Sequence, residues 1–408
     1  MKGKILHNFF YLSSSFVAIN IFGYVFHAVI SRKLGPSLYA EFNVLNALMV
    51  ALSTPVSILV SAITRVAVSA RTAGRDFNEV KRFSIKLGLT VALLLGFGTL
   101  FLSPLIKLFV KAENLYIFLP IALTFFIWGL NGILRGLLTS VESFALLSYA
   151  ATLELFMRAV CGILFVLAGF EVFGAIAGSA FGALCLMVLL LFKSNHIENT
   201  YNERKYNGAS RDSFSKTTAK VFFIAMPTGF FLQLDLLLAK RFFPAEEAGI
   251  FAAATLIGKS ILLFSTIAST VVYPKLIEEK LSKKGLTAFL WGIIVTMLLF
   301  LAGYALLKFF DRPVIDLLFG DKYTGVLEMA PLYIIAILPL ALHLQVTNYK
   351  GAIGGWTEGV WLWFVLIGYY VILELFSFNF SGYLKAIFIY HAVLTPMSFL
   401  MLYMRHRD

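Results

Sequence analysis

Ionisable side chains lie inside several long apolar stretches of the sequence, where a charge is costly. Glu154 and Arg158 are four residues apart in one stretch, so on a helix they share a face and can pair. Asp235 and Lys259 lie in two consecutive stretches, on either side of a turn that contains Pro244. A charge at the centre of a membrane-spanning helix costs about 2.5–3.5 kcal/mol, so each such residue needs a reason to be there. Glu154 and Asp235 are therefore candidates for charge pairing or for coupling to a cation.

A structural role is the alternative for these residues. Glu154 and Arg158 could form a buried ion pair that only holds the helices in place. Asp235 and Lys259 lie on adjacent antiparallel helices and could approach each other, although neither has a partner of opposite charge on its own helix. Both interpretations stay open at this point.

The turn between Asp235 and Lys259 occurs twice in the chain. The earlier copy reads SRKLGPSLYAEF and lies 208 residues before the later one, which places Arg32 on Lys240 and Pro36 on Pro244. This offset is about half of the 408 residues, which indicates two copies of one helical unit, a common plan among membrane transporters. Snorkelling of long basic side chains at helix ends is the alternative explanation for the basic residues at these matching places.

Polar side chains also follow one face of the first two apolar stretches. They are Asn20, Tyr24, His27 and Ser31 in the first stretch, and Asn43 and Asn46 in the second. A face of this kind avoids lipid and indicates contact with protein or with an aqueous cavity. A lone histidine such as His27 is more typically a hydrogen-bonded residue in the wall of such a cavity than a proton carrier.

The amino-acid composition indicates whether the chain lies in water or in a lipid bilayer. The chain is 60% hydrophobic and 14% charged, whereas a soluble domain is about 45–50% apolar and about 25% charged. It is therefore an integral membrane protein. The net charge of +12 would suggest nucleic acid for a soluble protein, but here the basic residues lie mainly in loops, and we expect no nucleic-acid partner. The two cysteines, Cys161 and Cys185, lie in apolar stretches and predict no disulfide framework.

Twelve apolar stretches are long enough to cross a bilayer. They are residues 8–31, 42–64, 83–106, 115–134, 146–168 and 173–192, and then 221–239, 250–273, 286–307, 329–348, 359–378 and 383–404. The sequence thus predicts an all-α polytopic membrane protein with an N-terminal six-helix bundle (1–192), a cytoplasmic basic linker (193–220) and a C-terminal six-helix bundle (221–408). Because each half has an even number of spans, the halves share one orientation and are related by a pseudo-two-fold axis along the membrane normal.

Loop charges predict the orientation of these spans. With the N-terminus inside, 21 lysines and arginines fall in cytoplasmic segments and 10 on the other side. Positive charge is enriched in cytoplasmic loops, so both termini are expected in the cytoplasm.

Motifs for covalent chemistry are missing from the sequence. It contains no Gly-x-Ser-x-Gly elbow, no phosphate-cradling glycine loop and no histidine pair at metal spacing. The predicted outer connections are also too short for the acceptor chemistry of a glycan polymerase or ligase. We expect no enzyme activity, no metal and no cofactor.

Several segments resemble a known family in their order and spacing. They are SRKLGPSLYAEFNVL in the earlier turn and the segments 135–159, 234–254 and 314–338. This pattern is similar to polysaccharide biosynthesis (Wzx-type) flippases of the multidrug/oligosaccharidyl-lipid/polysaccharide (MOP) exporter superfamily. The resemblance spreads over nearly the whole chain and implies two six-helix bundles that form a V around a central cavity.

The resemblance also implies a function. Such a protein moves a lipid-linked oligosaccharide, carried on an undecaprenyl diphosphate-type lipid, from the cytoplasmic to the outer leaflet of the inner membrane by alternating access, for surface polysaccharide assembly. The cations of its cavity or portals would be Arg32, Arg65, Arg135, Arg158, Lys240 and Lys259. Membrane lipid, H+ or Na+ as coupling ion, and a polysaccharide polymerase complex are the further partners that this implies.

A cation-coupled drug or metabolite exporter of the same superfamily is the alternative. Its cavity would be expected to carry mainly acids, because its usual substrates are cationic. A scaffold or scramblase without directed transport is a further class. The sequence does not identify the sugar of the substrate or the driving force.

Overall fold

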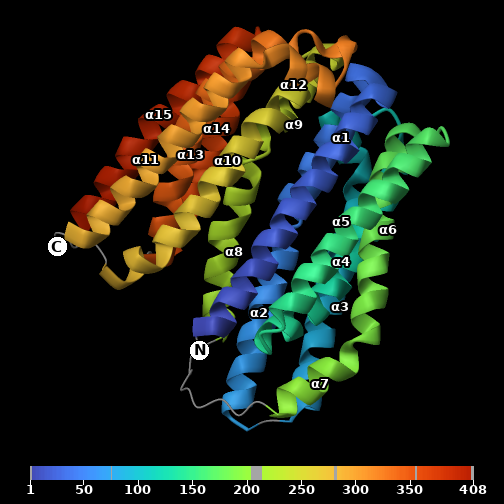
Figure 1. Cartoon of the computed structure of the whole chain (residues 1–408), viewed down its shortest axis with the longest axis vertical. Helices are drawn as coiled ribbons and strands as arrows, with labels where there is room; N and C mark the ends of the chain where they lie inside the picture. Colours follow the sequence, from blue (N-terminus) through green and yellow to red (C-terminus); the bar gives the residue numbers. More distant parts are fainter. Residues whose placement is uncertain (1, 75, 204–213, 280–282, 354–355, 406–408) are drawn as a thin grey trace. The chain divides into compact units, whose positions relative to one another are not determined.

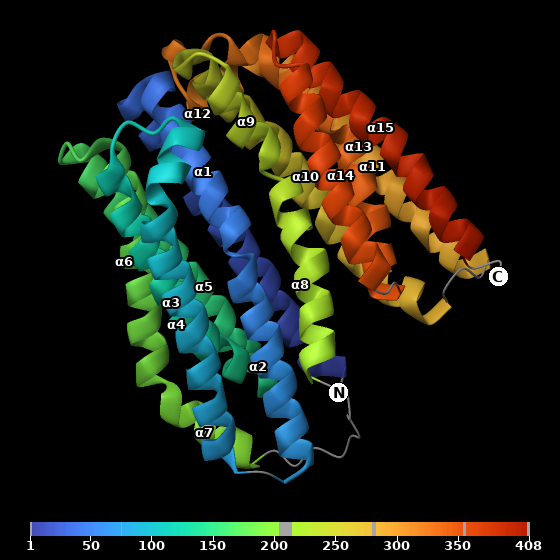
Figure 2. The same ribbon diagram turned by 180° about the vertical axis from the view of Figure 1, so that it is seen from behind.

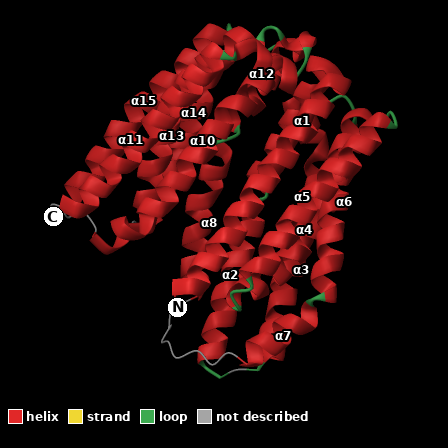
Figure 3. Cartoon of the chain, viewed as in Figure 1, coloured by secondary structure: helices red, strands yellow, loops and turns green. Residues whose placement is uncertain are grey.

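The computed structural model describes residues 2–74, 76–203, 214–279, 283–353 and 356–405 (Figure 1). The regular structure within these ranges is helical and includes no strand (Figure 3). The chain divides into two compact units. Unit 1 combines the residues up to Leu34 with Met49–Phe222, and unit 2 combines Gly35–Leu48 with the residues from Phe223 onward. The predicted all-α class is confirmed.

Unit 1 contains the first part of α1 (Lys2–Leu52) and the elements that follow it up to the linker. They are α2 (Thr54–Thr72), α3 (Phe77–Val110), η1 (Leu115–Ile117), α4 (Phe118–Ser140), α5 (Phe144–Leu167), α6 (Glu171–Phe192) and α7 (Ser194–Glu203). Helix α7 falls within the segment that we predicted as a linker, yet it packs into this unit. Its Tyr201 ring lies 5.0 Å from the ring of Phe77 on α3. Residues 204–213, the central part of the predicted linker, lie outside the described residues.

Glycines bring α6 very close to α5, and the two helices lie side by side in both views (Figures 1 and 2). A Cβ added to Gly178 would lie 2.6 Å from the carbonyl oxygen of Arg158, and one added to Gly182 would overlap the carbonyl oxygen of Glu154. The four-residue glycine spacing therefore serves packing within the protein. This contact supports α5 at the level of its two ionisable residues.

Unit 2 contains the later helices. They are the part of α8 (Phe214–Phe231) from Phe223 onward, α9 (Leu234–Phe242), α10 (Ala245–Glu279), α11 (Lys283–Phe309), α12 (Asp311–Leu318), η2 (Asp321–Tyr323), α13 (Val326–Ile353), α14 (Trp356–Leu375) and α15 (Phe380–Arg405). Helix α13 packs against α10, α11 and α15 (Figure 2). Large tyrosines fill this core, because Tyr333, Tyr369 and Tyr383 are all fully buried.

Helix α1 changes direction at Gly35, which has φ 70° and ψ 173°. Such a backbone conformation suits glycine, which has no Cβ to clash there. The segment that follows, Gly35–Leu48, contains most of the earlier copy of the repeated turn (31–42) and packs within unit 2. Its Tyr39 ring lies 6.2 Å from the ring of Phe319 and 5.8 Å from that of Tyr323. The two units therefore differ from the predicted bundle boundaries at this segment.

All twelve predicted spans coincide with helix. Among the described residues, nine helical stretches are long and apolar enough to cross a membrane, and α8 with α9, bent by 46°, makes a tenth. One of the nine, Val17–Arg71, is 55 residues long and contains the second predicted span (42–64) and the larger part of the first (8–31). The eleventh predicted span corresponds to the shorter apolar helix Gly359–Leu375. The structure thus agrees with a multi-pass membrane protein.

Candidate functional site

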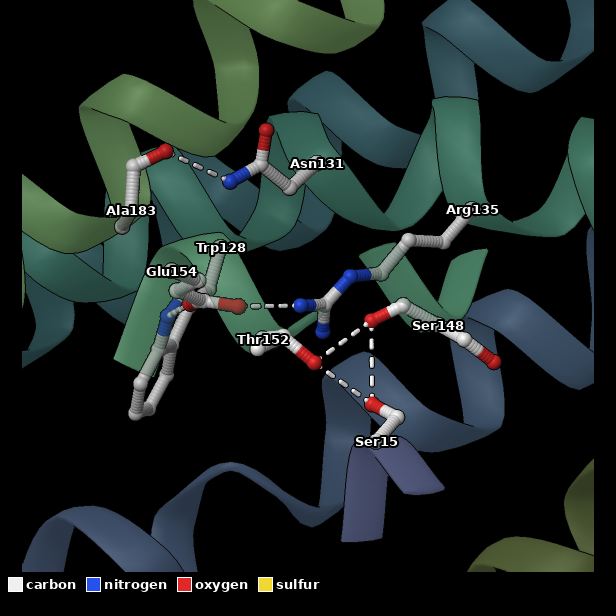
Figure 4. A network of polar contacts seen from close by, with 8 residues as sticks. All are labelled: Ser15, Trp128, Asn131, Arg135, Ser148, Thr152, Glu154 and Ala183. Atoms are coloured by element: carbon white, nitrogen blue, oxygen red, sulfur yellow. Dashed lines mark hydrogen bonds and ion pairs between the residues drawn. The ribbon is translucent and has the colours of Figure 1, made fainter. Parts of the chain in front are cut away.

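Unit 1 holds one buried carboxylate in a network between α4 and α5 (Figure 4). The indole Nε1 of Trp128 donates to Oε1 of Glu154 at 2.8 Å. The guanidinium of Arg135, seven residues or two turns further along the same face of α4, forms an ion pair with Oε2. Glu154 is 7% exposed, and these two donors balance a charge that would otherwise be very costly at this position.

Glu154 has an ion-pair partner that the sequence did not indicate. The spacing within α5 allows Arg158 to pair with Glu154, and in the structure Arg135 on α4 forms an ion pair with this carboxylate. Arg158 lies one turn further along α5, with its guanidinium carbon 5.9 Å from the centre of the Phe26 ring on α1. A shared helix face allows an ion pair, and a neighbouring helix can offer a further donor to the same carboxylate.

A chain of hydroxyl groups continues from this network toward α1 (Figure 4). Ser15 on α1 donates to the carbonyl of Ser148 at 3.0 Å, and its hydroxyl lies 2.7 Å from that of Thr152. Asn131 on α4 donates to the carbonyl of Ala183 on α6 at 2.9 Å. Polar groups thus join α1, α4, α5 and α6 at one level of unit 1.

Sequence analysis missed Trp128 and Asn131, although a signal for them exists. Residues 128, 131 and 135 are spaced by three and four positions, so on a helix they line one face. A tryptophan and an asparagine aligned with an arginine in an apolar helix indicate a buried polar face.

Besides Glu41, which is 2% exposed, unit 2 holds the buried carboxylate of Asp235, which is 1% exposed. It lies in the first turn of α9, directly after the 46° bend that separates α8 from α9. Its Oδ1 forms an ion pair with Nζ of Lys259 on α10 at 2.9 Å and accepts the backbone N–H of Leu236. Its Oδ2 accepts the hydroxyl of Tyr333 on α13 at 2.5 Å. The positive end of the helix dipole also favours an acid at this position.

The backbone of Asp235 is held as well as its side chain. The hydroxyl of Tyr383 on α15 donates to the Asp235 carbonyl oxygen at 2.6 Å. The network therefore joins α9, α10, α13 and α15. The expected approach of Asp235 and Lys259 is confirmed, and the two tyrosines are additions that the sequence did not indicate, because they lie 98 and 148 residues away along the chain.

The two ion pairs share one asymmetry. In unit 1 the Arg135 side chain is 30% exposed and that of Glu154 is 9% exposed. In unit 2 the Lys259 side chain is 17% exposed and that of Asp235 is 1% exposed. In both units the acid is the buried partner, and the cation is the one that reaches the surface of its unit.

The remaining candidates lie in several places. Arg32 on α1 and Arg65 on α2 are exposed, whereas Lys240, near the end of α9, is 7% exposed. Asn20 and His27 on α1 and Asn46 are half-buried, and buried Asn43 donates to the Tyr39 carbonyl oxygen at 2.8 Å. Asn43 and Asn46 lie in the segment that packs within unit 2. A common cavity for these residues stays a prediction. No group of three or more metal-binding side chains occurs in the described part of the chain.

The fold is similar to those of solved membrane transporters. An inward-facing multidrug resistance MATE family transporter of the MOP superfamily aligns over 95% of this chain and 94% of its own, with TM-score 0.69 and 16% identity. The lipid II flippase MurJ, in an inward closed conformation, aligns over 97% and 87%, with TM-score 0.65 and 13% identity. A MATE transporter of Vibrio cholerae aligns over 99% and 97%, with TM-score 0.61 and 13% identity. This chain is thus a multi-pass membrane protein with a MATE-like fold.

The sequence places the chain more narrowly than the fold does. The family described as polysaccharide biosynthesis protein matches residues 5–279, which is more than half of the chain. The chain belongs to this family, so the resemblance seen in its sequence is confirmed. Among curated proteins, no sequence relative matches.

Proposed function

We propose that the protein is a flippase for a lipid-linked oligosaccharide, carried on an undecaprenyl diphosphate-type lipid. It moves the head group from the cytoplasmic to the outer leaflet of the inner membrane, for surface polysaccharide assembly. Membership of the polysaccharide biosynthesis family supports this proposal. The fold shared with a lipid II flippase is compatible with it.

The observation that carries the proposal is the asymmetry of the two ion pairs. Arg135 and Lys259 are the more exposed partners, and buried acids hold both of them. A diphosphate cannot cross hydrocarbon at a useful rate, because burying an unpaired charge is very costly. Positioned guanidinium and ammonium groups replace its lost hydration by charge-assisted hydrogen bonds.

The proposed roles of the remaining candidates follow from their chemistry. Arg32, Arg65, Arg158 and Lys240 attract or pass on the diphosphate, and Asn20, His27, Asn43 and Asn46 bind sugar hydroxyls. Alternating access then moves the head group without a covalent step. Both termini lie in the cytoplasm, membrane lipid surrounds the chain, and a polysaccharide polymerase complex receives the product.

A cation-coupled drug or metabolite exporter is the second candidate. The MATE transporters among the solved relatives favour it, and Asp235 and Glu154 are acids that could bind a cation in another state of the cycle. In the structure, however, each carboxylate already has a cationic partner and an aromatic donor. The exposed charge in both pairs is positive, which suits an anionic substrate.

Transport in proteoliposomes tests the proposal. The substrate probe is a fluorescent prenyl-diphosphate-linked N-acetylglucosamine, and the competing probe is the cationic dye ethidium. Lys259→Gln should slow flipping of the diphosphate probe by about tenfold or more, because a hydrogen bond to a charged group contributes about 1.5–3 kcal/mol. Lys86→Gln, which changes an exposed lysine on α3, should match the unmodified protein. Transport of ethidium, without flipping of the diphosphate probe, would contradict the proposal.

A further inference from the structure

Two histidines in unit 2 lie outside both ion-pair networks. His343 on α13 is 3% exposed and His391 on α15 is 0% exposed. Their Nδ1 atoms lie 3.3 Å apart, which is within hydrogen-bond distance. Sequence analysis did not select either residue, because 48 residues separate them and neither lies at metal-ligand spacing.

Aromatic rings enclose the His343–His391 pair. The His391 ring centre lies 4.6 Å from that of Tyr369 on α14, 5.4 Å from that of Tyr390 and 6.1 Å from that of Phe231 on α8. The Tyr390 hydroxyl donates to the carbonyl of Val365 at 2.5 Å. The side chains that face the pair therefore come from α8, α13, α14 and α15.

Two polar atoms in this enclosure lack a hydrogen-bond partner among the described residues. They are Nε2 of His391 and the hydroxyl of Tyr369, and both residues are 0% exposed. Buried polar groups are nearly always hydrogen-bonded, so each exception needs an explanation. One such explanation is that the atom is a base whose free lone pair can accept a proton.

The Nδ1 contact allows two positions for the proton of a neutral His391 ring. One Nδ1 must donate and the other must accept, because each neutral imidazole has one N–H and one lone pair. Either assignment leaves Nε2 of His391 buried without a partner, as an N–H in one case and as a lone pair in the other, and an unsatisfied group of either kind costs about 1–3 kcal/mol. The assignment with Nδ1–H on His391 leaves Nε2 as a bare lone pair, which is ready to take up a proton.

Each of the two helices that carry the pair contains a proline close to its histidine. Pro339 precedes His343 by four residues on α13, and Pro396 follows His391 by five on α15. Thr395 joins the two helices, since its hydroxyl lies 3.2 Å from the carbonyl of Pro339 and 2.7 Å from that of His391. Proline removes a backbone hydrogen bond and allows a kink, so a local change at the pair can alter the packing of α13 against α15.

We propose that the His343–His391 pair binds one proton, taken up at Nε2 of His391, and that this proton is the coupling ion of transport. The coupling role rests on the proposed function. The closed arrangement described here holds the neutral pair, because an imidazolium among buried rings is costly. The protonated pair favours a conformation in which α13 and α15 admit water, so proton binding shifts the population toward that state.

Other titratable groups near the pair act on the same proton. Tyr369 and Tyr390 are neutral phenols beside His391, and Asp235 on α9 acts electrostatically on Tyr369. Phe231, the residue of α8 whose ring contacts His391, carries no charge. Asp235, which acts on Tyr369, forms an ion pair with Lys259, so a charge of opposite sign lies beside it.

Hydrogen exchange of the full-length protein in lipid nanodiscs, with no substrate present, tests the proton site. Histidine normally titrates between about pH 5 and 8, so exchange is compared near these limits after correction for the intrinsic rate. We expect acidification to lower the protection of peptides from α13 and α15, and His391→Gln to remove this response. His196→Gln, in α7 outside the predicted spans, should retain it. An acid response that persists in His391→Gln would overturn the proposal. If His391→Gln fails to fold, His343→Gln is used in its place.

Proteoliposomes with a pH gradient test the coupling. Addition of the fluorescent prenyl-diphosphate-linked N-acetylglucosamine should dissipate the gradient in the unmodified protein and not in His391→Gln. Substrate flipping without proton movement would overturn the coupling role. An intact acid response in nanodiscs combined with no flipping of the probe would instead contradict the proposed function and support the proton site.

Discussion

At the scale of single residues, the two units solve the same electrostatic problem with different side chains. Unit 1 uses glutamate, arginine and an indole N–H, and unit 2 uses aspartate, lysine and a phenol O–H. In each case the aromatic donor and the cation come from helices other than the one that carries the acid. The carboxylate therefore works as a junction between helices as well as a partner for the cation.

The pair of Glu154 and Arg135 can be tested by a double-mutant cycle. Arg135→Gln leaves a buried carboxylate without its cation, and we expect a loss of about 3 kcal/mol in the free energy of unfolding. Glu154→Gln combined with Arg135→Gln should recover most of that loss, because no uncompensated charge remains. Unfolding in mixed detergent micelles measures both values. A double variant no more stable than Arg135→Gln would show that the two side chains do not act as a pair.

At the scale of elements, close helix packing positions these side chains. Helix α6 presents glycines to α5 exactly where α5 carries Glu154 and Arg158, so the backbones approach without intervening side chains. In unit 2, the bend between α8 and α9 starts a new helix just before Asp235, which places the acid at a helix N-terminus. Each carboxylate thus depends on a local backbone feature.

Gly182→Ala tests the α5–α6 contact. Its Cβ would overlap the Glu154 carbonyl oxygen, so the helices must separate, and we expect a loss of about 1–3 kcal/mol, as for overpacking of a core. Gly98→Ala on α3 is the matched control, because a Cβ there meets nothing within 4 Å. Alanine is the better helix former, so this control should be neutral or slightly stabilising. Thermal unfolding in detergent compares the two, and equal stability would contradict the role of the glycine.

At the scale of the whole molecule, the chain forms two helical units. One short segment from the N-terminal part of the sequence packs in the C-terminal unit. Gly35–Leu48 packs within unit 2, although it lies between helices of unit 1. Most of the earlier copy of the repeated turn therefore lies in the same unit as the later copy, whereas its first residues, up to Leu34, belong to unit 1. The orientation of the units in the membrane is a prediction from loop charge.

Cysteine labelling tests that orientation in intact cells. Cys161 and Cys185 are first replaced by alanine, and single cysteines are then placed at the exposed positions Glu247 and Lys193. From the distribution of 21 against 10 basic residues, an impermeant maleimide should label Glu247→Cys and should reach Lys193→Cys only after the cells are opened. Labelling of Lys193→Cys in intact cells would reverse the predicted orientation.

The sequence by itself determined the class of protein and the positions of the helices, because an apolar stretch of about 20 residues has few alternatives in a bilayer. It also singled out Glu154, Asp235 and Lys259, since charge in such a stretch is rare and costly.

Only the tertiary structure decided the partners of these residues. Arg135 on the neighbouring helix forms an ion pair with Glu154, and Tyr333 reaches Asp235 from 98 residues away. His343 and His391 meet only because α13 and α15 pack together. The physical reason is that hydropathy constrains each helix separately. Contacts between helices depend instead on small residues and on the rotation of each helix about its axis. Apolar side chains do not specify this rotation, because they face both lipid and protein.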